Sequence, residues 1–125
     1  MISAVNRNKL GTEISVNGYT LNTDVPAQMG GDGKFPNPFE MFLSSFLACT
    51  ATSVFFYLRK HGISPEGIKL NLDPDMEGDH IKSAVITVLL PASFPAESEA
   101  PLLAFAKHCK VGSHLNFPYE VKLTR

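Results

Sequence analysis

A stretch without charge in the first half of the chain constrains the fold most. The eighteen residues 41–58 contain no Asp, Glu, Lys or Arg. The segment just before them, Asn37-Pro38-Phe39-Glu40, is typical of a helix start, with Asn at the N-cap, Pro at the first helical position and Glu returning to the cap. Gly62 follows two cationic residues and suits a helix stop. The sequence therefore predicts one long helix that ends near His61.

An apolar helix of this kind either crosses a membrane or is buried by other parts of a soluble protein. Eighteen residues lie near the lower limit for crossing a bilayer. The segment is too polar for a persuasive membrane span because it also contains six hydroxyl side chains: Ser44, Ser45, Thr50, Thr52, Ser53 and Tyr57. A soluble helix that is apolar on nearly every side must be covered on every side. A small chain can cover one face with its own sheet, so we expect a second copy to cover the other, where Ala48, Cys49, Ala51 and Thr52 permit a close approach.

Composition limits the remaining function classes. With 125 residues, 44% hydrophobic and 18% charged, the chain is expected to form a single globular domain over residues 1–125. Its net charge of -1, without a cluster of one sign, argues against nucleic-acid binding and against docking on anionic membranes. The N-terminus shows no secretory signal, so we expect a cytoplasmic protein whose two cysteines form no permanent disulfide.

The rest of the chain alternates like strands of a sheet. Residues 12–16 and 19–22 flank Asn17-Gly18, which predicts a two-residue hairpin turn, and a strand near residues 2–5 is expected to pair with it. We predict a loop over 24–34, strands over 68–72, 80–90 and 118–124, a polar turn over 73–79 and a second helix over 96–107. This order of elements favours an α+β fold.

Each cysteine has two interpretations from its local sequence. Cys49 lies well inside the long helix, which favours a small buried apolar side chain over a nucleophile, because the helix dipole fades after the first turn. Cys109 follows Lys107 and His108 and precedes Lys110. That setting predicts partial exposure and a field that favours the thiolate, or else an ordinary surface turn. A metal site of Cys109, His108 and His114 is weakly indicated, because structural zinc needs four ligands. Phosphate-binding and dinucleotide-binding motifs are absent, and neither a cofactor nor a metal is predicted.

Three segments in order carry a family resemblance. They are Asn22-Thr23-Asp24-Val25-Pro26 with Gly30-Gly31-Asp32, then Pro36-Asn37-Pro38-Phe39-Glu40-Met41 with Leu47-Ala48-Cys49-Thr50-Ala51, and last His108-Cys109-Lys110-Val111-Gly112-Ser113-His114-Leu115. With these segments the chain resembles the OsmC/Ohr family of thiol-dependent peroxidases. The resemblance implies antiparallel sheets, a long buried central helix and an intertwined homodimer. It also implies that Cys49 attacks the peroxide and that Cys109 resolves the resulting sulfenic acid.

Active members of that family also carry an arginine from an early segment, paired with a glutamate at the start of the long helix. No arginine lies between Arg7 and Arg59, and Lys34 is the one cation in the loop before the helix. Glu40 stands one position later than the glutamate of the organic-hydroperoxide branch, where this chain has Phe39. We expect Glu40 to serve the capping box, while Arg7 and Lys34 are candidate replacements for the activating cation.

Two functions therefore stand side by side. The first is a cytoplasmic, homodimeric peroxidase that reduces organic hydroperoxides or hydrogen peroxide through Cys49 and Cys109, and is regenerated by a thiol reductant of the dithiol or lipoyl type that the family implies. The second is a non-enzymatic or weakly active dimer of the same fold that binds a small molecule in an apolar helix groove. A metal-binding role for Cys109, His108 and His114 ranks third.

Overall fold

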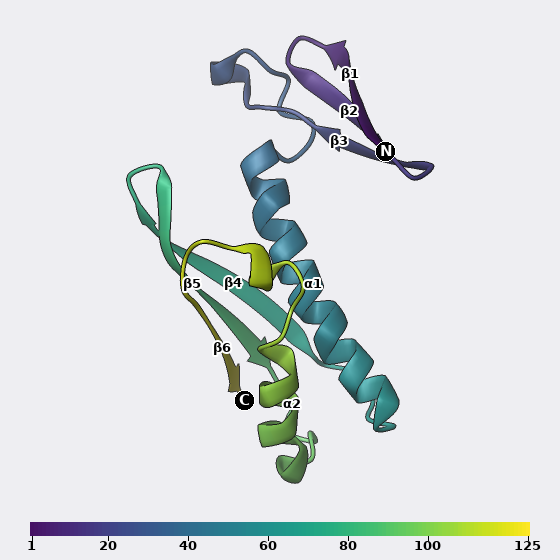
Figure 1. The fold of residues 1–125 in the computed structure, drawn as a ribbon, viewed down its shortest axis with the longest axis vertical. Coiled ribbons are helices and arrows are strands. Elements are labelled where there is room, and N and C mark those ends of the chain that lie inside the picture. Colours follow the sequence, from purple (N-terminus) through teal and green to yellow (C-terminus); the bar gives the residue numbers. More distant parts are fainter. The chain divides into compact units, whose positions relative to one another are not determined.

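The computed structural model describes all residues 1–125 and divides them into two compact units, Met1–Ser44 and Ser45–Arg125. Each unit contains one three-stranded sheet, and the helix α1 (Pro38–Lys60) begins in the first unit and continues into the second (Figure 1). The α+β class predicted from the sequence is confirmed. A single domain over residues 1–125 stays a prediction.

The N-terminal unit contains an antiparallel meander. Its strands are β1 (Ile2–Asn8), β2 (Gly11–Val16) and β3 (Tyr19–Thr23). Asn17 and Gly18 turn between β2 and β3 with φ of 47° and 85°, the positive angles of the expected two-residue turn. Both faces of this sheet are largely exposed, and Thr23, Asp24 and Gly31 are the only buried residues of the unit.

A loop follows β3 and is organised around one buried carboxylate. Within this Asp24 loop (residues 24–34), the carboxylate accepts N–H groups from Val25 at 2.8 Å, Asp32 at 3.3 Å and Lys34 at 3.3 Å. The Val25 hydrogen bond is the largest cause that holds the pKa of Asp24 below its ordinary value. The short 3-10 helix η1 (Ala27–Met29) lies within the loop, which otherwise has the irregular structure that its glycines predict.

The caps of α1 lie where the sequence places them. Asn37 Oδ1 accepts the Glu40 N–H at 2.8 Å, and Glu40 Oε1 accepts the Asn37 N–H at 3.0 Å. This reciprocal pair is a capping box. The helix ends at Lys60, and Gly62 adopts a φ of 67° just beyond it. The helix start, its stop and the capping role of Glu40 are confirmed.

The C-terminal unit contains β4 (Lys69–Glu77), β5 (His80–Leu89), η2 (Ala96–Ser98), α2 (Glu99–Ala106), η3 (Gly112–His114) and β6 (Tyr119–Thr124). The polar turn predicted over residues 73–79 is confined to Gly78 and Asp79, because β4 runs on through Asp73 and Pro74 to Glu77. Pro74 is tolerated because β4 is an edge strand, where a missing N–H breaks no ladder on the open side. The sequence pattern could not show this extension of β4, because it depends on pairing with β5, where Ala84 lies opposite Pro74.

The prediction of antiparallel sheets is confirmed for the first sheet and for β4 with β5, and is wrong for the last strand. β6 pairs with β5 in parallel, with Ala84 opposite Tyr119 and Leu89 opposite Thr124. Parallel neighbours need a crossover of a dozen or more residues. The segment that contains α2 provides it, so the second sheet is mixed.

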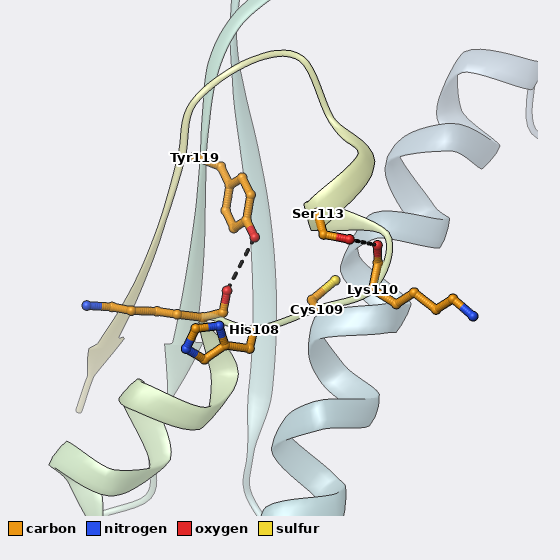
Figure 2. Close-up of a pocket in the computed structure, with 6 residues that line it drawn as sticks. His108, Cys109, Lys110, Ser113 and Tyr119 are labelled. Atoms are coloured by element: carbon orange, nitrogen blue, oxygen red, sulfur yellow. Dashed lines mark hydrogen bonds between the residues drawn. The ribbon is translucent and has the colours of Figure 1, made fainter.

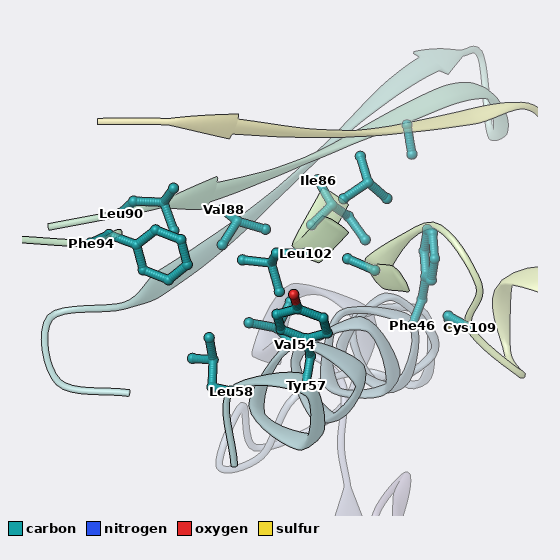
Figure 3. Close-up of a cluster of buried hydrophobic side chains, with 13 residues drawn as sticks. Phe46, Val54, Tyr57, Leu58, Ile86, Val88, Leu90, Phe94, Leu102 and Cys109 are labelled. Carbon is teal, nitrogen blue, oxygen red and sulfur yellow. The ribbon is translucent and has the colours of Figure 1, made fainter. Parts of the chain in front are cut away.

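The core lies between one face of α1 and this mixed sheet (Figure 3). Phe46, Val54 and Leu58 of α1 are fully buried, and Ile86 and Val88 of β5 face them. On other sides of the helix, Phe55 and Phe56 remain 42% and 58% exposed. The helix is long and apolar enough to cross a membrane, a test that the core helix of a soluble protein also passes. One chain therefore covers one side of α1 and leaves aromatic side chains uncovered on the others.

Candidate active site

Two thiols from distant parts of the sequence meet in the C-terminal unit. Cys49 lies in the middle of α1 and is half-buried, whereas Cys109 lies just after α2 and is 5% exposed. The two thiols are close enough for each to shift the pKa of the other. Sixty residues of sequence separate the two, so this neighbourhood arises from packing and not from a local motif.

The segment that carries Cys109 folds into a compact turn against α1. In this thiol loop (residues 109–115), the Val111 N–H points at the Cys49 sulfur at 3.5 Å, and the Gly112 N–H points at the Cys109 sulfur at 3.2 Å. Ser53, one helical turn after Cys49, donates its hydroxyl to the His108 carbonyl at 3.5 Å and ties the start of the loop to the helix. The loop therefore presents backbone donors to both sulfur atoms.

The turn is held by its own hydrogen bonds. The Ser113 N–H donates to the Cys109 carbonyl at 3.0 Å, and the Ser113 hydroxyl donates to the Lys110 carbonyl at 2.6 Å. His114 Nδ1 lies 2.8 Å from the same Lys110 carbonyl. With the turn held in this way, the N–H groups of Val111 and Gly112 point at the sulfur atoms, a concave arrangement that favours negative charge.

The two thiols have opposite pKa shifts. Burial alone raises the pKa of the Cys49 thiol, but hydrogen bonds from the Val111 N–H and the Cys109 thiol, followed by the N–H and the charge of Lys110, hold it below its ordinary value. Burial raises the pKa of Cys109, and its hydrogen bond to Cys49 raises it further. The opposite shifts favour the thiolate form at Cys49 over Cys109.

This asymmetry reverses what local sequence indicated. Cys109 is buried with a raised pKa, so the expected partial exposure and thiolate-favouring field at Cys109 are wrong. The nearby cation Lys110 acts on Cys49 across the packing interface instead. Cys49 is not an inert core residue either, since it is half-buried and accepts donors from the loop.

Gly112 and Tyr119 fix the back of the site. A Cβ on Gly112 would lie 2.3 Å from the Tyr119 hydroxyl, so a larger residue here would force the ring or the loop to shift. Tyr119 donates its hydroxyl to the Lys107 carbonyl at 3.3 Å, and its ring meets that of Phe46 edge-on with centroids 4.9 Å apart. Tyr119 thus braces the loop against the core. Sequence analysis did not single out Tyr119, and its alternating position in the last strand was its only signal.

An open pocket of about 500 Å³ lies over Cys109 (Figure 2). Its lining consists of Lys107, His108, Cys109, Lys110, Ser113 and Tyr119. The lining contains two lysines and a histidine and no carboxylate. No group of three or more His, Cys, Asp or Glu side chains in the chain is arranged to hold a metal ion.

The other candidate residues belong to the N-terminal unit. Arg7 forms a two-point pair with Glu13, through Nε to Oε2 at 2.9 Å and Nη2 to Oε1 at 2.6 Å. Lys34 donates its backbone N–H to Asp24, and Glu40 closes the capping box. The side chains of Arg7 and Glu40 thus have local partners within their own unit, and Lys34 is held there through its backbone. The activating donors described for Cys49 come from the thiol loop, which sequence analysis did not identify as such.

Comparison with known proteins places the chain in a family. A family model described as OsmC-like protein matches residues 31–124. No curated protein is significantly similar to the sequence. Among solved structures, a provisionally assigned osmotic stress induced and detoxification response protein from Psychrobacter arcticus 273-4 superposes with a TM-score of 0.81 at 17% identity, over 98% of this chain and 94% of that chain.

Two further structures have the same fold. An organic hydroperoxide resistance protein OsmC from Legionella pneumophila gives a TM-score of 0.66 at 16% identity, over 100% of this chain and 96% of that one. An organic hydroperoxide resistance protein from Elizabethkingia anophelis, with thiocyanate bound, gives 0.63 at 13% identity, over 99% and 94%. The family model covers most of the sequence, and the chain belongs to the OsmC-like protein family.

Proposed function

We propose that this protein is a homodimeric thiol peroxidase that reduces organic hydroperoxides or hydrogen peroxide in the cytoplasm. The observation that carries the proposal is the pair of neighbouring but unequal thiols, both facing backbone N–H groups of the thiol loop: the pKa of Cys49 is lowered and the pKa of Cys109 is raised. The names of two related structures, both organic hydroperoxide resistance proteins, support this substrate class.

The unequal pair suits both halves of the oxidation. The Cys49 thiolate attacks one peroxide oxygen, the O–O bond breaks, and Cys49 becomes a sulfenic acid while an alkoxide leaves. Cys109, still protonated, gives its proton to that alkoxide. The resulting Cys109 thiolate then attacks the Cys49 sulfur and forms a disulfide, and the departing hydroxide takes a proton from solvent. A thiol reductant, of the dithiol or lipoyl type that the family implies, returns both cysteines to thiols.

The thiol loop supports activity without an arginine beside Cys49. The lowered pKa of Cys49 arises from the Val111 N–H, the Cys109 thiol and Lys110. Lysine is a point charge and lacks the planar fork of a guanidinium. We therefore expect turnover slower than that of a peroxidase with an arginine in its site.

A homodimer is the proposed cover for the exposed aromatic side chains of α1. Phe55 and Phe56 stay open to solvent in one chain, and the N-terminal sheet has few buried residues of its own. Monomers seldom leave large apolar patches uncovered. Light scattering at micromolar concentration should report twice the mass of 13.6 kDa. A stable folded monomer would contradict this part of the proposal.

Peroxide consumption by purified protein tests the function. Reduced protein should consume an organic hydroperoxide and hydrogen peroxide, and comparison of the two rates identifies the preferred substrate. Cys49→Ser should abolish consumption. Cys109→Ser should spare the first turnover and leave Cys49 as a sulfenic acid that proceeds to sulfinic acid. If peroxide leaves both thiols free, the peroxidase proposal is wrong.

A small-molecule binder is the second candidate, and one observation favours it. An apolar pocket of about 530 Å³ is lined by Phe55, Leu58, Arg59, Ile63 and Pro65. Its volume suits a small ligand. Binding of an apolar fluorescent probe that persists unchanged in Cys49→Ser, in a protein inert to peroxide, would support this candidate.

A further inference from the structure

We propose that Thr50 is a further residue of the thiol chemistry: its buried hydroxyl donates a hydrogen bond to Cys109 when that thiol becomes a thiolate, and so speeds the attack of Cys109 on oxidised Cys49. This role rests on the proposed function, because it concerns the second step of the same oxidation. Thr50 belongs neither to the thiol loop nor to the lining of the pocket over Cys109.

The Thr50 hydroxyl is an orphan in the reduced protein. The Thr50 side chain is fully buried, and its Oγ1 is the single buried side-chain oxygen or nitrogen atom without a hydrogen-bond partner. Thr52, two positions on, donates its hydroxyl to the Ala48 carbonyl at 2.9 Å, as threonines within helices often do. Thr50 makes no such bond to the corresponding carbonyl of Phe46. A buried hydroxyl left without a partner costs folding stability, so its presence calls for a reason.

The position of Thr50 on α1 brings this hydroxyl to Cys109. Phe46 and Val54, four residues before and after, are fully buried in the core that also contains Cys109 (Figure 3). Residues four apart share one face of a helix, so Thr50 lies in the same buried row. The Thr50 hydroxyl is close enough to lower the pKa of Cys109, whereas the shift at Cys49 has other causes.

The orphan state of the hydroxyl suits a donor that acts only during the reaction. Burial keeps Cys109 protonated in the reduced protein, and a neutral thiol is a weak acceptor. A thiolate is a charged acceptor, and hydrogen bonds to charged groups are the stronger ones. The interaction is therefore gained when Cys109 loses its proton. An interaction that is stronger in the reacting state than in the resting state raises the rate of that step.

The step in which this donor acts is the formation of the disulfide. The alkoxide that leaves the peroxide takes the Cys109 proton, and the Thr50 hydroxyl donates to the resulting thiolate. The thiolate attacks the Cys49 sulfur, the sulfur–sulfur bond forms and the sulfur–oxygen bond of the sulfenic acid breaks. The departing hydroxide takes a proton from solvent. Two thiols become one disulfide, the hydroperoxide becomes an alcohol and water, and Thr50 keeps its own proton throughout.

Titration of Cys109 alone tests the contact without peroxide. Cys49→Ala removes the other thiol and adds no hydroxyl, so the ultraviolet absorbance of the thiolate reports Cys109, with Cys49→Ala/Cys109→Ala as the blank. Addition of Thr50→Val should raise the midpoint by about one pH unit, because the thiolate loses a donor. Addition of Thr50→Ser, which keeps the hydroxyl, should restore the midpoint to within about 0.3 pH units of its original value.

The resolving attack can be timed with both cysteines present and a dipyridyl disulfide in place of peroxide. Cys49 attacks the reagent, releases one thiopyridone and keeps the other in a mixed disulfide. Cys109 then attacks the Cys49 sulfur and releases the second, at a rate that does not depend on reagent concentration. At neutral pH, Thr50→Val should slow the second release about threefold, because the thiolate fraction falls about tenfold while the nucleophilicity of the thiolate rises about threefold. The first release should keep its rate.

Folding stability separates this role from a packing role. Thr50→Val removes an orphan hydroxyl and keeps the shape of the side chain, so the urea midpoint should rise. Thr50→Ser deletes a buried methyl group and should lower it. The more stable variant should therefore be the slower one. Thr87→Val is the matched control, because it makes the same change at a half-buried position of β5, on the face opposite to Ile86, and should leave both Cys109 readouts unchanged.

Three results would each overturn the inference. They are a Cys109 midpoint that Thr50→Val leaves in place, a second release that stays as fast as in the wild type, and an equal change of either readout in Thr87→Val. A loss of stability in Thr50→Val would do the same, since the hydroxyl would then have a partner in the reduced protein. If the expected changes appear but peroxide does not oxidise Cys49, the proposed function alone fails. If peroxide is consumed and the Cys109 midpoint does not move, the role of Thr50 alone fails.

Discussion

Two loops of this molecule share one feature, backbone N–H groups that point at an acidic side chain, but the consequences differ. The Asp24 loop and the thiol loop each point backbone N–H groups at an acidic side chain, a carboxylate in one and a pair of thiols in the other. In each loop, backbone N–H donors help to lower the pKa of one group: Asp24 in the first, Cys49 in the second. Each loop is therefore a small site for negative charge.

The difference lies in the group that is held. An ordinary carboxylate is already ionised at neutral pH, so the donors around Asp24 hold the loop in place and change no reactivity. An ordinary thiol is mostly protonated at neutral pH, so similar donors at Cys49 create a nucleophile. Cys109 adds what the Asp24 loop lacks, a second acid that is held protonated beside the first. The same backbone geometry therefore stabilises structure or promotes chemistry according to the pKa of its target.

The largest expected effects are losses of folding stability when the crowded glycine of either loop is replaced by alanine. A Cβ on Gly31 would lie 2.1 Å from the Val25 carbonyl, which is backbone, and one on Gly112 would lie 2.3 Å from the Tyr119 hydroxyl. We expect Gly31→Ala to lower the free energy of unfolding by about 3 kcal/mol and Gly112→Ala by about 1–3 kcal/mol. Urea unfolding measures both.

The thiols should distinguish the two alanine variants. Alkylation of Cys49 at neutral pH should slow in Gly112→Ala, because the loop donors move, and should stay normal in folded Gly31→Ala. The double variant Tyr119→Phe/Gly112→Ala should recover part of the lost stability, since the closest contact is to the removed hydroxyl. Slowed alkylation in Gly31→Ala alone would contradict the division of roles.

The stability conferred by Asp24 should depend on pH. Its folded pKa is lowered, so its contribution is present above the unfolded pKa of about 3.9 and is lost as the pH falls through the folded pKa. Asp24→Asn should unfold at lower urea concentration than the wild type at pH 7, and the gap should narrow toward pH 2. A gap that stays constant with pH would show that the charge of Asp24 contributes nothing.

Removal of the Lys110 charge should change the reactivity of Cys49, with a smaller effect than the glycine substitutions have on stability. Lys110→Ala deletes the side-chain charge near Cys49 but keeps the backbone N–H. We expect the rate of Cys49 alkylation at pH 7 to fall by about twofold to threefold, the effect of one exposed charge. Lys82→Ala is the matched control. If the alkylation rate fell equally in Lys82→Ala, the effect would come from the net charge of the protein and not from the position of Lys110.

The smallest effect is expected at Glu40. Glu40→Gln keeps an acceptor for the Asn37 N–H, so the free energy of unfolding should change by less than about 0.5 kcal/mol and Cys49 alkylation should not change. Asn37→Ala removes the other half of the capping box and should cost about 1 kcal/mol. If Cys49 were alkylated more slowly in Glu40→Gln, Glu40 would instead be holding a cation near the thiol.

Features that local chemistry decides could be predicted from the sequence. The Asn37 and Glu40 cap, the Gly62 stop and the Asn17-Gly18 turn each depend on residues within a few positions of one another. The run of β4 through Pro74 and the parallel pairing of β6 could not be predicted, because a distant partner strand sets them.

The same distinction applies to the site. Both cysteines were marked by their motifs, but the charges beside Cys109 left open whether it has a field that favours the thiolate or lies in an ordinary surface turn. The structure assigns the lowered pKa to Cys49, since its donors lie sixty residues away in sequence on the thiol loop. Burial and hydrogen bonds from packing outweighed the charges that adjoin Cys109 in the sequence.

Alkylation of the two cysteines as a function of pH tests the central claim most directly. Reduced protein is pulsed with iodoacetamide across a pH series, and mass spectrometry of the peptides gives the rate at each cysteine. We predict that Cys49 reacts with a midpoint below the ordinary thiol value of about 8.5 and that Cys109 reacts only at higher pH. A lower midpoint for Cys109, or a shared midpoint near the ordinary value, would contradict the account.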